Sequence, residues 1–260
     1  MAISQNAGER FSLAGKVALL TGAAGLYGQS ILEALAGAGA EDFIASRNLT
    51  ELRKVAVAQG ERGRKVSALR FDQSSLRSIE KLGAALSAVK IDILVNNAAA
   101  RPMKSYDDPA EAFSESMKTN ATGLFALTRT VAGLMRDGGS IINMGSIQGM
   151  VGPDASLYAG LPLNGFLPDY FFHKGGMLNF TRFLAAQYGP RGIRCNVLSP
   201  GGVAREGAPK EFVRRYSART FLGRPALLED IQGAVIFLAS DASRYVTGVN
   251  LPVDGGYTAK

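Results

Sequence analysis

Tyr170 and Lys174 are two side chains whose types and spacing could do proton chemistry. Residues four apart share a helix face, and apolar residues recur at three- and four-residue steps as far as Tyr188, which predicts an amphipathic helix starting near Pro168. A lysine beside a phenol favours the phenolate and lowers its pKa from about 10, so Tyr170 could accept a proton near neutral pH. Ordinary helices show the same spacing, so the pair needs support from the rest of the chain.

The composition predicts a globular chain of one large domain, or at most two, because 47% of the 260 residues are hydrophobic and 20% are charged. The single cysteine, Cys195, cannot form an internal disulfide. No amino-terminal apolar segment resembles a signal peptide, so we expect a cytoplasmic protein. No apolar run is long enough to cross a bilayer, so no membrane association is expected.

The charge balance is basic, with 29 Lys and Arg against 22 Asp and Glu and a net charge of +7. No block of basic residues with interleaved aromatics is present, so we do not expect nucleic acid binding and interpret the charge as a sign of a small anionic ligand. No Cys, His and Asp cluster has metal-ligand spacing, so no catalytic metal is expected. The only histidine, His173, is expected to pack rather than react.

A glycine-rich turn near the amino terminus predicts a nucleotide site. After a polar leader over residues 1–13, the apolar run 16–20 leads into this turn, and apolar residues at helical spacing follow it. Glycines let the backbone approach a pyrophosphate, which the first N–H groups of the helix would bind. A plain tight turn with a glycine for helix packing is the alternative. The expected cofactor-binding residues here are Gly22, Gly25, Leu26, Tyr27 and Gly28.

The end of the second predicted strand, 42–45, bears on the choice between the two nicotinamide cofactors. An acidic residue there would bind the ribose hydroxyls and repel a 2′-phosphate, but the chain has Ser46, Arg47 and Asn48. A hydroxyl and a guanidinium suit the phosphate, so NADP(H) is predicted over NAD(H). Arg47 could instead be a solvated residue at a helix start.

Strands and helices alternate along the chain. Further strands are predicted at 66–71, 91–95 and 140–144, and helices at 75–89 and 110–136. This rhythm predicts a single doubly wound α/β domain of Rossmann type over residues 14–260, with a parallel sheet of about seven strands and helices on both faces. Ligands bind such sheets at the carboxyl ends of the strands, which is where Ser146 falls.

Taken together, these motifs resemble those of the short-chain dehydrogenase/reductase family, over essentially the whole length of the chain. The constellation, more than any one motif, favours a catalytic interpretation of Tyr170 and Lys174. The motifs stand in the family's order: the glycine turn, Asp72, Asn96-Asn97-Ala98-Ala99, Asn120, Ser146, Tyr170-x-x-x-Lys174, Ser199-Pro200-Gly201 and Val253-Asp254-Gly255-Gly256.

The resemblance implies hydride transfer between a nicotinamide ring and an alcohol or ketone. It implies that Tyr170 is the acid/base and that Ser146 hydrogen-bonds the substrate oxygen. Lys174 would lower the Tyr170 pKa and hold the nicotinamide ribose, and Asn120 would position a water in the proton relay. A homotetramer or homodimer is implied, built partly on the helices around 110–136 and 170–188. Further implied cofactor contacts are Asp72, Gln73, Asn97, Ala98, Ala99, Tyr170, Lys174, Pro200, Gly201 and Val203.

The glycine turn and two other positions depart from the family's pattern. Leu26 stands where glycine is usual, and the turn is similar to that of the longer, sugar-nucleotide-processing branch. Ala99 replaces a frequent glycine, and Arg205 stands where a threonine is common after Pro200-Gly201.

The distance of 24 residues from Ser146 to Tyr170 is also longer than family members usually show. Tyr158 lies nearer the usual distance, but Pro162 stands where its lysine would be needed, so we reject it. The extra residues form a proline- and glycine-rich insertion, 147–169, expected to be an ordered loop over the active site. A surface or interface excursion is the alternative.

The segment 201–227 lies where the family keeps a mobile substrate lid, and it holds six basic residues against two acidic ones. A positive field at the mouth of the site would attract an anion, which indicates a negatively charged substrate such as a sugar acid. Arg205 could fork onto a carboxylate, although solvated charges or contacts to cofactor phosphates are the alternative. The expected substrate residues are Ser146, Gln148, Asp154, Tyr158, Asn164 and Arg205.

The sequence therefore predicts an NADP(H)-dependent oxidoreductase that interconverts a secondary alcohol and a ketone on a small polar substrate, such as a sugar, polyol or sugar acid. A 3-oxoacyl or other small ketone reductase of the same family is one alternative. A non-catalytic nucleotide-binding regulatory protein is an alternative of another class. It is disfavoured because binding alone would not require Asn120, Ser146, Tyr170 and Lys174 together.

Overall fold

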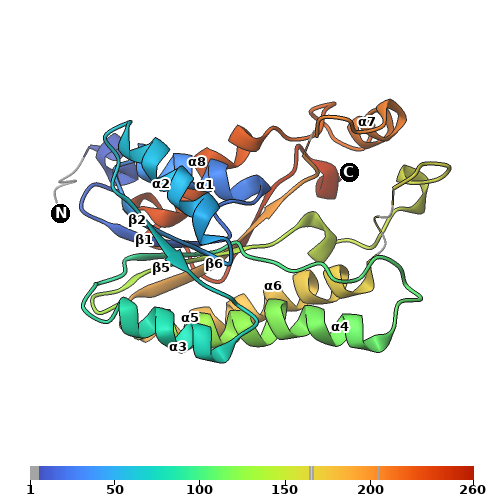
Figure 1. Cartoon of the computed structure of the whole chain (residues 1–260). Helices are drawn as coiled ribbons and strands as arrows, with labels where there is room; N and C mark the ends of the chain where they lie inside the picture. Colours follow the sequence, from blue (N-terminus) through green and yellow to red (C-terminus); the bar gives the residue numbers. More distant parts are fainter. Residues whose placement is uncertain (1–5, 164, 166, 204) are drawn as a thin grey trace.

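A seven-stranded parallel sheet runs through the computed structural model, which describes residues 6–163, 165, 167–203 and 205–260 (Figure 1). Its strand order is β3-β2-β1-β4-β5-β6-β7, with the reversal between β1 and β4. This confirms the doubly wound α/β fold predicted from the sequence and leaves a crevice at the carboxyl ends of the strands. The strands are β1 Val17–Thr21, β2 Glu41–Ser46, β3 Val66–Arg70, β4 Ile93–Asn96, β5 Gly139–Met144, β6 Ile193–Pro200 and β7 Asn250–Val253.

Helices cover both faces of the sheet, with α1, α2 and α8 on one face and α3, α4, α5 and α6 on the other (Figure 1). Each face has its own apolar core. Leu20 and Ile31 belong to the core under α1 and α8, while Leu94 and Leu184 belong to the core under α5 and α6. The helices are α1 Leu26–Gly37, α2 Leu49–Gly60, α3 Leu76–Ala85, α4 Ala110–Met117, α5 Leu124–Ala132, α6 Pro168–Tyr188, α7 Lys210–Ser217 and α8 Gln232–Ala239.

The helix predicted over 110–136 is interrupted. A π-helical segment, η2 Lys118–Gly123, lies between α4 and α5. The side-chain amide of Gln73 donates to the carbonyl of Thr119 at 3.0 Å, which holds this segment against the end of β3. Single π-helical turns often occur at functional sites, and this one contains Asn120.

The predicted leader, insertion and lid all contain helical turns where they are described. Within the leader, Leu13 is fully buried and the Phe11 ring lies 6.5 Å from that of Phe237. The insertion 147–169 contains two short 3-10 turns and ends inside α6, and the lid 201–227 contains α7. These 3-10 turns are η3 Ile147–Gly149 and η4 Ala155–Leu157. Asn164, predicted to face the substrate, lies outside the described residues.

Two searches cover only the part of the chain that the structure describes. None of its helices is long and apolar enough to cross a membrane. It holds no group of three or more His, Cys, Asp or Glu side chains that could bind a metal ion.

Candidate active site

A cavity of about 500 Å³ lies at the carboxyl ends of the central strands. It joins the glycine turn, the ends of β2 to β6, the insertion and the lid, and so brings together most of the predicted residues. Gly28, Asn48, Asn120 and Asp154 do not line it. The predicted residues that line it are Gly22, Gly25, Leu26, Tyr27, Ser46, Arg47, Asp72, Gln73, Asn97, Ala98, Ala99, Ser146, Gln148, Tyr158, Tyr170, Lys174, Pro200, Gly201, Val203 and Arg205.

The glycine turn presents the start of α1 to this cavity. The chain leaves β1 at Gly22 with a φ of +70°, in the left-handed region that favours glycine. A Cβ at Gly28 would lie 2.2 Å from the Gly22 carbonyl oxygen, so Gly28 allows the turn and the helix to touch. Leu26 and Tyr27 are first-turn residues, whose N–H groups have no acceptor within the helix. The turn therefore fits a diphosphate at the positive end of α1.

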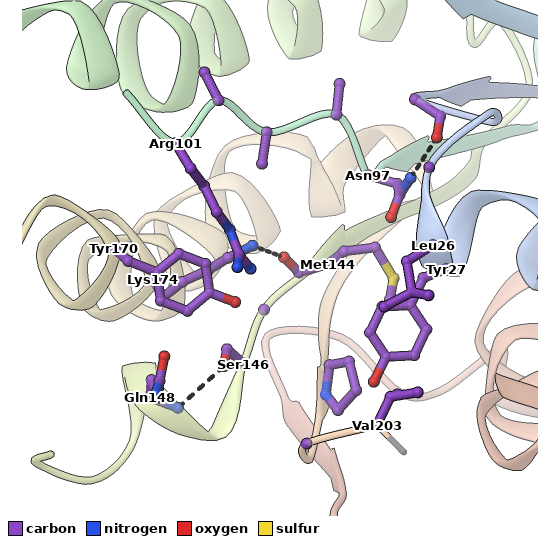
Figure 2. Close-up of a pocket in the computed structure, with 18 of the residues that line it drawn as sticks. Leu26, Tyr27, Asn97, Arg101, Met144, Ser146, Gln148, Tyr170, Lys174 and Val203 are labelled. Atoms are coloured by element: carbon purple, nitrogen blue, oxygen red, sulfur yellow. Dashed lines mark hydrogen bonds between the residues drawn. The ribbon is translucent and has the colours of Figure 1, made fainter. Parts of the chain in front are cut away.

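Asn97 holds the glycine turn to the end of β4. Its side-chain nitrogen donates to the carbonyl oxygen of Thr21 at 3.1 Å and to that of Gly22 at 3.0 Å. Figure 2 shows the Asn97 side chain beside the glycine turn. The Thr21 hydroxyl in turn accepts from the N–H groups of Asn97 and Ala98 at 3.2 and 3.1 Å. The Asn97 side chain thus positions the turn at the wall of the cavity.

Tyr27 connects α1 to the first residue of the lid. Its hydroxyl donates to the carbonyl of Gly201 at 3.0 Å, and burial raises its pKa, so it stays a neutral donor. The next residue, Gly202, donates its N–H to the hydroxyl of Tyr216 in α7. The lid is therefore attached at its root to both the glycine turn and its own helix.

The end of β2 places Ser46 and Arg47 at the cavity, but Asn48 caps α2 instead. The Asn48 side-chain oxygen accepts from the Glu51 N–H at 3.2 Å. Asp72, after β3, accepts from the N–H and hydroxyl of Ser74 at 3.0 and 2.7 Å. Burial raises the Asp72 pKa, but these hydrogen bonds and the nearby Arg47 outweigh it and hold the pKa below its usual value.

Tyr170 and Lys174 lie in the first turns of α6, as predicted. Lys174 is buried and donates to the carbonyl of Met144 at the end of β5, and its Nζ lies 5.6 Å from the centre of the Tyr170 ring (Figure 2). Burial lowers the pKa of Lys174, which Tyr170 partly opposes. The amine is therefore fixed between the strand end and the phenol.

The surroundings of Tyr170 favour its phenolate. Burial raises the pKa of Tyr170, but the charges of Lys174 and Arg101, with hydrogen bonding from Ser146, outweigh burial and place the pKa below its ordinary value. Ser146 is itself buried, and its hydroxyl accepts from the Gln148 N–H at 3.1 Å. A proton acceptor and a hydroxyl thus face one point of the cavity.

Tyr158 and His173 also have rings near Tyr170, but the surroundings of these two rings do not favour a proton acceptor as those of Tyr170 do. Tyr158 packs on Phe212 with ring centres 5.6 Å apart, and burial raises its pKa. The geometry therefore agrees with the choice of Tyr170 over Tyr158. His173 is buried with its ring perpendicular to that of Tyr170 at 5.2 Å, so it packs, as expected. Burial, Lys174 and Arg101 lower its pKa to about 3.

Asn120 is buried beneath the segment that follows β4. Its side-chain oxygen accepts from the Ala100 N–H at 2.9 Å, and its side-chain nitrogen donates to the Ala100 carbonyl at 2.8 Å and the Ser116 hydroxyl at 3.0 Å. The side chain is thus used to fix the backbone at Ala100. The water-positioning role implied by the family resemblance stays a prediction.

Arg101 is the main cavity residue that the sequence reasoning missed. Its guanidinium carbon lies 4.3 Å from the centre of the Tyr170 ring, and the side chain reaches down from the segment after β4 (Figure 2). Like Ser146, Arg101 follows the carboxyl end of a strand, but it lies farther beyond that end, so proximity to the strand alone did not single it out. Phe212 and Tyr216 of α7 also line the cavity and were missed.

Four of the six lid cations are engaged in ion pairs. The pairs are Arg214 and Arg215 with Glu211, Arg219 with Asp154, and Arg224 with Asp230. Asp154, predicted to face the substrate, therefore binds the lid instead.

The insertion and α7 are joined by these and neighbouring contacts, which we call the clasp. In the clasp, Arg219 pairs with Asp154 and donates to the Ser156 hydroxyl at 2.5 Å. Arg215 donates to the carbonyls of Ser156 and Ala159 at 3.0 and 2.7 Å. The predicted insertion and lid thus contact each other, and Tyr158 of the insertion and Phe212 of the lid both line the cavity.

Comparisons with known proteins agree with this geometry. Residues 22–258 match a family model described as enoyl-(acyl carrier protein) reductase. The chain is 34% identical to an L-rhamnose 1-dehydrogenase (NAD(P)(+)) of Azotobacter vinelandii, covering 93% of this chain and 96% of that one. It is also 34% identical to a 2-dehydro-3-deoxy-D-gluconate 5-dehydrogenase of Bacillus subtilis, covering 97% and 98%.

A solved structure is similar throughout. The crystal structure of a gluconate 5-dehydrogenase from Burkholderia cenocepacia, in complex with NADP and tartrate, superposes with a TM-score of 0.88 at 30% identity, covering 98% of this chain and all of that one. The chain belongs to the short-chain dehydrogenase/reductase family. It is an NAD(P)-dependent oxidoreductase that acts on CH–OH groups.

Proposed function

We propose that the protein is an NADP(H)-dependent oxidoreductase that interconverts a secondary alcohol and a ketone on a sugar, polyol or sugar acid. The observation that carries the proposal is the meeting of Ser146, Tyr170 and Lys174 in the cavity that also contains the glycine turn. The names of the relatives support the substrate class, since they include a rhamnose dehydrogenase and a dehydrogenase of a deoxygluconate derivative.

The roles proposed for the three side chains follow from their positions. In the oxidation direction the Tyr170 phenolate accepts the proton of the substrate hydroxyl, while Ser146 holds the same oxygen. Lys174 favours the phenolate, because its charge opposes the effect of burial on the Tyr170 pKa. The nicotinamide, when bound, takes up the hydride in oxidation or supplies it in reduction.

The proposed preference for NADP(H) depends on Arg47 and Ser46. Both line the cavity at the end of β2, and Arg47 is exposed there near Asp72. A guanidinium can make charge-assisted hydrogen bonds to a 2′-phosphate. The acidic residue that would instead bind the ribose hydroxyls is absent from the positions 46–48.

We also propose a homodimer or homotetramer that forms in the cytoplasm. Phe125 on α5 and Phe172 and Phe183 on α6 expose 44%, 65% and 58% of their surface, on the helices that the family resemblance assigns to assembly. Exposed apolar clusters of this kind mark interaction surfaces. The free thiol of Cys195 suits a reducing compartment. Sedimentation should show a mass of at least twice 27.4 kDa.

The test of the proposed function is a turnover screen with NADP⁺ or NADPH, read at the nicotinamide absorbance. It should include sugars, polyols, aldonates and their keto forms, with a 3-oxoacyl thioester to test the alternative family activity. We expect turnover in the sugar-derived group. Tyr170→Phe should remove it by about two to four powers of ten while cofactor binding persists, because only the acid/base hydroxyl is lost.

The matched control for this variant is Tyr158→Phe, which removes the phenol nearest the usual family distance from Ser146, one of three other phenols that line the cavity. It should retain turnover of the substrate found in the screen. Loss of turnover in Tyr158→Phe with full activity in Tyr170→Phe would show that the acid/base has been assigned to the wrong tyrosine.

A further inference from the structure

Arg101 presents a cation to the reacting centre without an acidic partner. Its guanidinium carbon lies 4.3 Å from the Tyr170 ring centre, at the cavity wall (Figure 2). Among the residues that the structure describes, no carboxylate forms an ion pair with it. The backbone just before it is fixed, because Asn120 holds both polar groups of Ala100.

We propose that Arg101 binds a carboxylate of the substrate, so that the substrate is an anionic sugar derivative such as an aldonate. A guanidinium presents a planar fork of donors that matches a carboxylate with two parallel hydrogen bonds. The inference rests on the proposed function and deepens it, by naming the charge of the substrate and the residue that recognises it.

The lid is the competing source of positive charge, and its geometry makes it the weaker one. Four of its six cations already pair with Glu211, Asp154 or Asp230. Arg205 lines the cavity and is exposed, as Arg101 is, but its electrostatic contact is with Tyr27 of the glycine turn. Arg101, by contrast, lies over the phenol at which the proton is exchanged.

Arg101 also links the charge of the substrate to the pKa of Tyr170. The groups that face Tyr170 are Lys174 and His173 of α6, Arg101, Ser146, and the phenols of Tyr158 and Tyr27. A carboxylate bound to Arg101 offsets its charge, which removes part of the stabilisation of the phenolate. Binding of an anionic substrate should therefore raise the pKa of Tyr170, and binding of a neutral substrate should not.

The first experiment compares D-gluconate with the neutral D-sorbitol in the presence of NADP⁺. Arg101→Met should lower the ratio of kcat/KM for gluconate over sorbitol by about 10- to 100-fold, the value of a charged hydrogen bond. Arg101→Lys keeps the charge but loses the planar fork of donors, so its ratio should lie between those of the wild type and Arg101→Met. Arg77→Met on the exposed surface of α3 removes the same charge at a residue that does not line the cavity and should leave the ratio unchanged.

Arg205→Met separates the two candidate cations. If Arg205→Met lowers the ratio and Arg101→Met does not, the carboxylate site belongs to the lid and the inference is wrong. If the enzyme turns over both compounds and the ratio is unchanged in both variants, the inference is also wrong, while the proposed function stands.

If the wild type turns over neither compound, a binding measurement decides the inference independently. D-gluconate is titrated calorimetrically into the wild-type complex with NADP⁺ and into the Arg101→Met complex. Binding to the wild type that is at least ten-fold weaker in the variant supports the carboxylate site. Equal affinity, or no binding to the wild type, overturns it.

The pH profile gives a readout that a merely structural role of Arg101 would not move. In the oxidation direction, the acid limb of kcat/KM follows deprotonation of Tyr170 in the free enzyme. Arg101→Met should shift this limb to higher pH, because a cation that favours the phenolate is lost. Arg101→Lys should leave it near its wild-type position, and a wild-type limb in Arg101→Met would contradict the coupling.

Discussion

We expect Asp42 to make the protein less stable as the pH rises, and its replacement should show by how much. The side chain is fully buried in β2, and neither carboxylate oxygen has a hydrogen-bond partner. It shares a face of the strand with Ile44 and points toward the apolar core under α1. Burial raises its pKa from 3.8 to about 8, although the charge of Arg64 opposes this.

The direction of the effect follows from proton linkage. The folded-state pKa lies above the unfolded-state value, so the folded protein holds the proton more tightly. The contribution of Asp42 to stability is therefore complete below about pH 4 and is lost as the pH rises toward 8. Each pKa unit is worth about 1.4 kcal/mol, so the wild type should lose up to about 4 kcal/mol of unfolding free energy between pH 5 and pH 9 through this group.

Asp42→Asn replaces the acid with a neutral group of the same shape. We expect the unfolding free energy of Asp42→Asn, relative to that of the wild type, to increase between pH 5 and pH 9. The increase should be up to about 4 kcal/mol, measured by urea denaturation at fixed protein concentration. The exposed Asp107→Asn is the matched control and should follow the wild type at both values. Parallel curves for the wild type and Asp42→Asn between pH 5 and pH 9 would refute the reasoning.

Two further substitutions test the cofactor site and the clasp. Arg47→Asp should shift the relative affinity from NADP(H) toward NAD(H) by about one to two powers of ten in a direct titration, because a phosphate partner is exchanged for an acceptor of the ribose hydroxyls. Tighter binding of NAD(H) than of NADP(H) by the wild type would contradict this. Arg219→Met should raise the KM for substrate by less than about ten-fold and leave cofactor affinity unchanged, since an exposed ion pair contributes at most about 1 kcal/mol. Arg214→Met, which breaks an ion pair within α7 only, is its control, and equal KM values in the two variants would argue against a role for the clasp.

Local patterns predicted the parts of the site that depend on one element at a time. The glycine turn follows from a strand and a helix that meet at glycines, and Tyr170 and Lys174 follow from their spacing on one helix. The fold itself follows from the alternation of strands and helices, because a parallel sheet needs a crossover between neighbouring strands. Ser146 could be placed because it directly follows a strand.

The rest depends on contacts between distant segments, which spacing does not encode. The guanidinium of Arg101 reaches Tyr170 only because the segment after β4 and the first turn of α6 face the same cavity. The lid charge was overestimated for a similar reason, since Asp154 lies in the insertion and pairs with Arg219 of the lid. The pairing of Glu211 with its neighbours in α7 is local and could have been read from their three- and four-residue spacing.

The hydrogen bond from Tyr27 to Gly201 bears on the order in which ligands enter. It connects the first turn of the helix that receives the diphosphate to the residue at which the lid begins. A dinucleotide bound at this turn would therefore lie beside the root of the lid, because Tyr27 and Gly201 line the same cavity. We expect compulsory-order kinetics, in which the dinucleotide enters first and leaves last. The substrate would then meet a lid whose position the bound dinucleotide has already set.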